Sequence, residues 1–283
     1  MILLSLMFTE SMKSLLTSVT SKVSAFEFYH CVACQSDNTG VKPIKDQYSW
    51  CNLKALKQAG HGHDPAGVSA TKEGEIMVLC SACPHPGKNM PETLEDVSPG
   101  NQWIYSLFLA INANFHLKCQ LVSSDDKDPG LSQGWGYFIK ESNYKVNCVS
   151  HNTVNMADTK SSKGLAATGV GTVVCARHDM RLANGVRDLQ KGEKYLNMDY
   201  IVFSTLSRFS SIPSHKKLWH RHSTIQVFHS EFHLATHIAA CQTTFSFNWS
   251  PYVGRTDREV PECSWANINR VAVSTKEMAP GSR

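Results

Sequence analysis

The chain lacks any apolar run long enough to cross a bilayer, which takes about 20 residues. It also lacks a recognisable leader, because the opening MILLSLMFTESMK has only a short apolar stretch, no basic flank before it and no small-residue cleavage site after it. We therefore expect neither a signal peptide nor a membrane partner. A reducing compartment, the cytosol or the nucleus, is favoured, and there the thiols remain free to bind metal.

A strong charge of either sign is also missing. The net charge is +4 and the isoelectric point is about 8.5, which permits a nucleic-acid partner without the concentrated basic patch that would indicate one. The glycine-rich segment 163–172 matches no phosphate-binding fingerprint, and no internal repeat stands out. Nucleotide-binding and repeat proteins are thus not indicated.

Cysteine and histidine, by contrast, are concentrated in four pairs with a two-residue spacing. This spacing lets one turn of backbone present two ligands to a tetrahedral zinc ion. We group the pairs by chain order into two structural zinc sites, Cys31 and Cys34 with Cys80 and Cys83, and Cys148 and His151 with Cys175 and His178. Two alternatives remain open: Cys51, His61 or His63 as competing ligands, and ordinary buried cysteines with surface histidines.

Composition divides the chain into three parts. We expect an amphipathic helical or flexible lead over residues 1–29, a cysteine-cluster zinc module over 30–92, and a larger core over 93–283 with a Cys-His knuckle inserted at 148–178. Shorter elements are a helical stretch at 53–58, a strand-like run at 75–79, a helix at 192–206 and a second helix beginning near residue 230. The apolar run at 103–118 suits either a strand or a helix.

Several long motifs resemble fungal KDZ (Kyakuja-Dileera-Zisupton) transposases, over residues 50–283. They are VLCSACPHPGKNMP, WIYSLFLAINANFHLK, SSDDKDPGLSQGW, KSSKGLAATGVGTVVCARHDM, NGVRDLQKGEKYLNMDYIVFS and GRTDREVPECSWANINRVA. The upstream part is similar to the cysteine-cluster domain that accompanies these transposases. The resemblance implies an α/β fold class, with a truncated RNase H-like transposase core beside a small cysteine- and histidine-rich zinc module.

The resemblance also implies three separated acids that hold Mg²⁺ or Mn²⁺ for two-metal phosphoryl transfer. The position of the first acid carries Asn112, an amide in place of a carboxylate. The segment that bears the second acid is missing around residues 210–215, where no carboxylate occurs between Asp199 and Glu231. The third acid is expected at Glu262, with Glu259 as a second candidate. Mg²⁺ or Mn²⁺ is expected only if catalysis survives.

These losses predict a catalytically inactive, transposase-derived protein of the nucleus that keeps zinc-stabilised modules and binds DNA. The short basic run around Lys216, Lys217 and Arg221 would contact a DNA backbone or simply be solvated. The alternatives are an active metal-dependent DNA nuclease that uses Glu262 with an acid such as Asp199, and a product that does not fold. The sequence predicts no oligomeric state.

Overall fold

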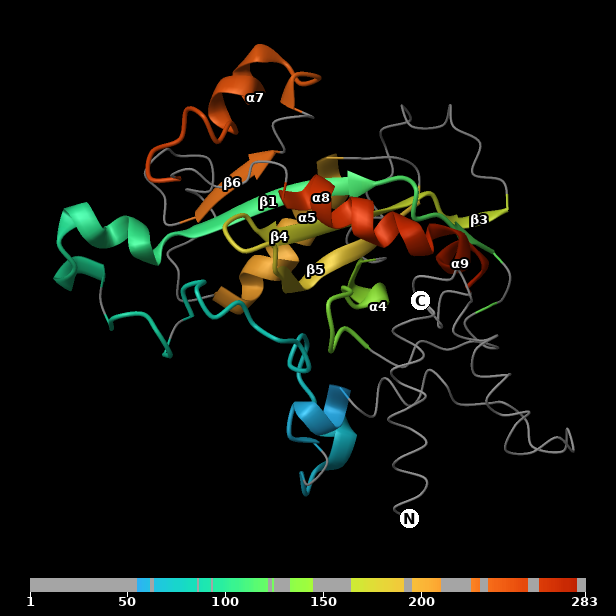
Figure 1. Cartoon of the computed structure of the whole chain (residues 1–283). Coiled ribbons are helices and arrows are strands. Elements are labelled where there is room, and N and C mark those ends of the chain that lie inside the picture. Colours follow the sequence, from blue (N-terminus) through green and yellow to red (C-terminus); the bar gives the residue numbers. More distant parts are fainter. Residues whose placement is uncertain are drawn as a thin grey trace, which may run out of the picture.

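A computed structural model describes residues 55–61, 64–85, 87–92, 94–121, 124, 133–144, 164–190, 195–209, 225–229, 234–253 and 260–278. Within them lies a four-stranded mixed sheet with helices on both faces (Figure 1). The predicted α/β class is therefore confirmed. No helix in these ranges combines the length and the apolar character that a bilayer crossing requires.

The sheet has the order β5-β4-β1-β6. Strand β1 (Leu107–Asn114) pairs antiparallel with β4 (Gly169–Cys175), and β4 pairs antiparallel with β5 (Arg181–Leu189). On its other side β1 pairs in parallel with β6 (Ile225–His229). A small second sheet joins β2 (Cys119–Gln120) to β3 (Leu165–Ala167).

Strand β1 resolves the ambiguous apolar run at 103–118. A 3-10 helix, η4 (Pro99–Tyr105), leads into it, and the strand then takes eight residues that are almost all buried. A strand covered on both faces has no polar side to alternate with, which explains the nearly continuous apolar sequence. The odd and even positions of β1 nevertheless contact different partners.

The odd positions of β1 face helix α5 (Tyr195–Leu206). This helix confirms the one predicted at 192–206, and it packs closely on the sheet because β4 offers Gly171 beneath it. A Cβ built on Gly171 would lie 2.9 Å from Ile201 Cδ1 and 3.2 Å from Met198 Sδ. The core cluster on this face also contains Cys80, Cys83 and Cys175.

The even positions of β1 face the other way. Phe108 and Ala110 pack with Phe228, Phe247 and Val253. Farther along this face lies helix α8 (Val260–Ile268), whose Trp265 packs in a third cluster with residues of β4 and β5. Figure 1 shows α8 over β1, with α9 (Ala272–Glu277) beyond it. The segment η9 (Asn269–Val271) joins the two helices, and α9 contacts β2.

The remaining elements are short. They are helix α4 (Glu141–Tyr144), helix α7 (Ala239–Thr244) and the 3-10 segments η2 (Gly67–Ala70), η3 (Leu94–Asp96) and η7 (Ser207–Phe209). Residues 55–58 are helical, as expected for 53–58.

One expectation for a short element needs correction. The run at 75–79 forms no strand, and its backbone bonds to a neighbouring loop, since Gly74 N donates to Gly134 O and Ile76 N donates to Trp135 O. The start expected near residue 230 for the second helix lies outside the described residues; Leu234 is helical, and α7 follows from Ala239. The division at residues 92 and 93 stays a prediction.

Candidate functional site: a cysteine-histidine cluster and an amide-carboxylate pair

Two tight turns carry the first candidate site. In one turn the backbone N–H of Cys83 donates to Cys80 O over 3.3 Å, and in the other His178 N and Asp179 N donate to Cys175 O over 3.3 and 3.0 Å. Each turn therefore folds a two-residue spacing so that both side chains project to the same side. The second turn leaves the end of β4, so the sheet fixes its position.

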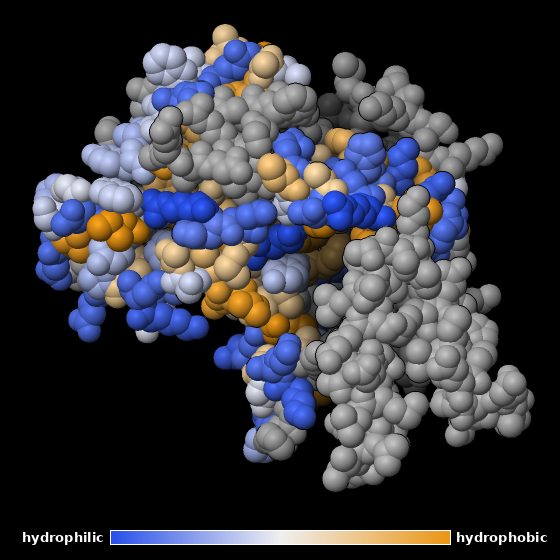
Figure 2. All heavy atoms as spheres, in the orientation of Figure 1, coloured by the Kyte–Doolittle hydropathy of each residue, from blue (hydrophilic) through white to orange (hydrophobic). Residues whose placement is uncertain are grey.

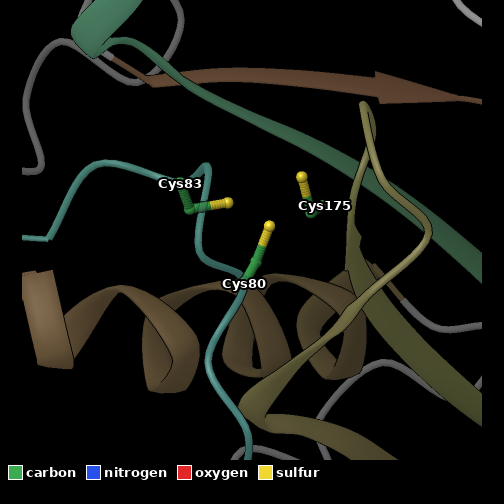
Figure 3. Close-up of side chains that lie close together, drawn as sticks. All are labelled: Cys80, Cys83 and Cys175. Atoms are coloured by element: carbon green, nitrogen blue, oxygen red, sulfur yellow. The ribbon is translucent and has the colours of Figure 1, made fainter.

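The two turns face each other, and the sulfur atoms of Cys80, Cys83 and Cys175 all lie within 4.8 Å of one another (Figure 3). His178 lies beside this group: its Nδ1 is 3.3 Å from Cys175 Sγ and 3.6 Å from Cys80 Sγ, but it does not come within 4.8 Å of all three sulfur atoms. Zinc bonds of about 2.3 Å to sulfur and 2.0–2.1 Å to nitrogen place tetrahedral ligands about 3.6–3.8 Å apart. The three cysteines could thus hold a metal ion, and His178 is the candidate fourth ligand beside them.

The cluster is buried and its turns are held from outside. The three cysteines are 1%, 3% and 2% exposed. Asn89 Nδ2 donates to Cys83 O over 2.8 Å, and a ring nitrogen of His85 lies 2.7 Å from Cys80 O. His85 also stacks on Phe209 with ring centroids 5.8 Å apart. Such second contacts orient ligands before a metal arrives.

The electrostatics of the cluster favour a thiolate. The pKa of Cys175 is lowered to about 5, chiefly because the Cys83 thiol donates a hydrogen bond to it, with help from His178 and the backbone N–H groups of Arg177 and His178. The pKa of Cys83 is raised by that same hydrogen bond, by burial and by repulsion from the neighbouring thiols. The neighbours of Cys175 thus favour its thiolate, the form of cysteine that binds metal.

This arrangement differs from the grouping expected from chain order. Cys80 and Cys83 were assigned to one site and Cys175 and His178 to another, yet Cys80, Cys83 and Cys175 form a single cluster with His178 beside it. All four pairs in the sequence share one spacing, so spacing could not select the partners; the packing of residues 80–83 against the end of β4 in one core cluster does. Cys31, Cys34, Cys148 and His151 lie outside the described residues.

The second candidate site lies on the opposite face of β1. Asn112 is 8% exposed, and its Nδ2 donates to Glu262 Oε1 over 2.8 Å. Asn114 lies two residues farther along the strand, and its Nδ2 donates to Asn269 Oδ1 over 2.8 Å. These two bonds attach α8 and the turn that follows it to the central strand. The structure thus brings together Asn112 and Glu262, the positions assigned to the first and third acids.

The chemistry of this pair is that of one carboxylate and one neutral amide. Among the residues that the structure describes, only the cysteine cluster brings three or more Cys, His, Asp or Glu side chains close enough to share an ion. Asp199 lies on α5, across the sheet from Glu262, where partial burial raises its pKa. Glu259 and residues 210–215 fall in gaps of the description.

The sequence model of the Kyakuja-Dileera-Zisupton transposase family matches residues 105–283, more than half of the chain. The chain belongs to this transposase family. No curated protein and no solved structure matches it. The family match spans β1 to α9 and includes Asn112, Glu262, Cys175 and His178, whereas Cys80 and Cys83 precede it. The cluster therefore joins the KDZ region to the segment before it.

The contact between the amide and the carboxylate can be tested by restoring a carboxylate. We expect Asn112→Asp to lower the free energy of unfolding by about 1–3 kcal/mol without metal, because it replaces a hydrogen bond with two like charges. Mn²⁺ at about 100 times its dissociation constant should return about 2.7 kcal/mol. Thermal unfolding with and without Mn²⁺ measures both effects. Asn114→Asp is the control, since its partner is an amide, and equal Mn²⁺ responses of the two variants would contradict the pairing.

Proposed function

We propose that this KDZ protein is a transposase derivative that no longer joins or cleaves DNA strands but keeps a structural zinc centre and binds DNA. The observation that carries the proposal is the hydrogen bond from Asn112 to Glu262. A DNA partner places its action in the nucleus, and the fungal source stays a prediction from the resemblance.

We infer the loss of catalysis from the missing negative charge at Asn112. Two-metal phosphoryl transfer needs clustered carboxylates that hold two divalent ions about 4 Å apart. Asn112 brings no formal charge, and its NH₂ group occupies an oxygen of Glu262 that a metal would otherwise use. Among the described residues, Glu262 is the carboxylate beside Asn112, and one carboxylate provides too little charge to assemble such a pair of ions.

The proposed RNase H-like character of the core has a geometric argument in its favour. The position of the first acid lies on the central strand, and helix α8 carries the retained acid against it from far along the chain. Acids at separate points of a sequence can share ions only if the fold brings them together in this way. The finer fold assignment rests on this meeting of β1 and α8.

The zinc assignment rests on Cys80, Cys83, Cys175 and His178. Three thiols and one imidazole select zinc over the hard cations Mg²⁺ and Ca²⁺. A metal held there would link the turn at residues 80–83 to the end of β4, and such binding free energy adds directly to folding stability. Its proposed role is therefore structural, because four protein ligands leave no open position for a substrate.

Metal content tests this assignment. We expect freshly purified protein to contain zinc, and Cys175→Ser to lose one equivalent per chain with a lower melting temperature, because the site loses a thiolate ligand. Elemental analysis gives the zinc content. Cys241→Ser and Cys263→Ser are matched controls outside the cluster that should keep the full content. A Cys175→Ser protein with unchanged zinc would refute the ligand set.

The retained Glu262 is the observation in favour of an active nuclease as the second candidate. We expect no nicking of supercoiled DNA in Mn²⁺ by the protein as it stands, because the charge needed for two ions is missing. A gel assay that compares the unmodified chain with Glu262→Ala distinguishes the inactive derivative from the active nuclease. Cleavage that disappears in the variant would establish the active alternative and overturn our proposal.

DNA affinity should be mainly electrostatic. We expect the logarithm of the association constant to fall linearly with the logarithm of salt concentration, because basic side chains that neutralise phosphates release counterions. Binding to a duplex between about 50 and 200 mM salt, measured by fluorescence anisotropy, gives the slope. A flat dependence, or no binding at low salt, would count against the DNA-binding part of the proposal.

A further inference from the structure

Tyr252 has an unusual backbone for a bulky residue. Its φ is 66°, in the left-handed region that favours glycine, and its side chain is 58% exposed. Such a conformation costs about 1–3 kcal/mol and persists only where the surroundings determine it. The contacts of the ring show what holds it there.

The Tyr252 ring lies beside other planar groups. It stacks on Trp103 with centroids 6.1 Å apart and an interplanar angle of 5°. The guanidinium of Arg177 lies 5.5 Å from the centroid of Trp103 and 3.8 Å from that of Phe108. Tyr252 nevertheless stays 58% exposed, which leaves part of its ring open to a further planar group.

A second exposed aromatic side chain lies nearby. Trp249 is 71% exposed and only three residues before Tyr252, so the two Cα atoms are within about 11 Å of each other. Trp249 borders a pocket of about 310 Å³ beside α7, lined also by Gln242, Thr243, Ser246 and Asn248. Leu234, Ala235 and Ala239 complete the lining, and its polar groups bond within the chain, since Gln242 Nε2 donates to His237 O over 2.6 Å and Thr243 Oγ1 donates to Ala240 O over 3.1 Å.

The polarity of this region points to a neutral planar ligand. The pocket lining contains no Asp, Glu, Lys or Arg. Figure 2 shows hydrophilic and hydrophobic residues intermixed over the α7 region, rather than the broad apolar patch that marks a permanent protein interface. Nucleobases are recognised by stacking on aromatic rings and by hydrogen bonds along their edges.

We propose that Tyr252 and Trp249 form a stacking site for unpaired nucleobases of single-stranded DNA. The site rests on the DNA binding proposed above and adds to it a preference for unpaired over paired bases. A base inside a duplex has both faces covered by its neighbours and cannot stack on Tyr252.

Binding of fluorescent oligothymidylate and of a duplex of equal length tests the site. Tyr252→Gly removes the ring while supplying the residue that best adopts a positive φ, so the fold should survive, as a melting curve verifies. We expect Tyr252→Gly and Trp249→Ala to bind the single strand about 5- to 150-fold more weakly, with little change for the duplex. Tyr252→Phe and Trp249→Phe should retain binding.

Val273→Ala, an exposed apolar truncation on α9, serves as the matched control and should bind like the unmodified chain. Unchanged single-strand affinity in Tyr252→Gly and Trp249→Ala, with duplex binding intact, would overturn the stacking site and leave the proposed function standing. Absence of binding to either DNA would refute both. Loss of self-association without loss of DNA affinity would assign the aromatic surface to a second copy of the chain and overturn the site.

Discussion

The two-sided burial of strand β1 is the constraint on which the rest of the structure depends. Side chains of a strand alternate between its faces, so one eight-residue element organises two separate environments. Its odd positions pack with α5 in the core cluster that contains the cysteines. Its even positions turn Asn112 and Asn114 toward α8 and η9. The thiol cluster and the amide-carboxylate pair are therefore separated by the sheet.

The two sites differ in their side-chain chemistry. The cysteine cluster gathers three thiols that could hold a metal, with the pKa of Cys175 lowered to about 5 by its hydrogen-bonded neighbours. Asn112, the position that the family resemblance assigns to the first acid, carries an amide that donates a hydrogen bond to Glu262. A buried amide is well suited to this contact, because its NH₂ group satisfies the carboxylate without adding charge. In the function proposed above, the fold keeps this contact while the catalytic charge is lost.

Aromatic contacts link the turn after β4 to Tyr252. Arg177 lies between Cys175 and His178 in sequence, and its guanidinium contacts Trp103, on which Tyr252 stacks. The turn that positions Cys175 and His178 thereby also supports an exposed aromatic ring.

The sequence by itself determined the family, the α/β class and the helix at 192–206, because these depend on long motifs and local periodicity. It also identified Asn112, Glu262, Cys80, Cys83, Cys175 and His178 as notable residues. Only the tertiary structure decided their partners. Identical two-residue spacings carry no information on which turns meet, and the choice between strand and helix at 103–118 depended on burial from both faces. Packing between segments far apart in the chain placed residues 80–83 beside the end of β4, and helix α8 against β1 so that Glu262 meets Asn112.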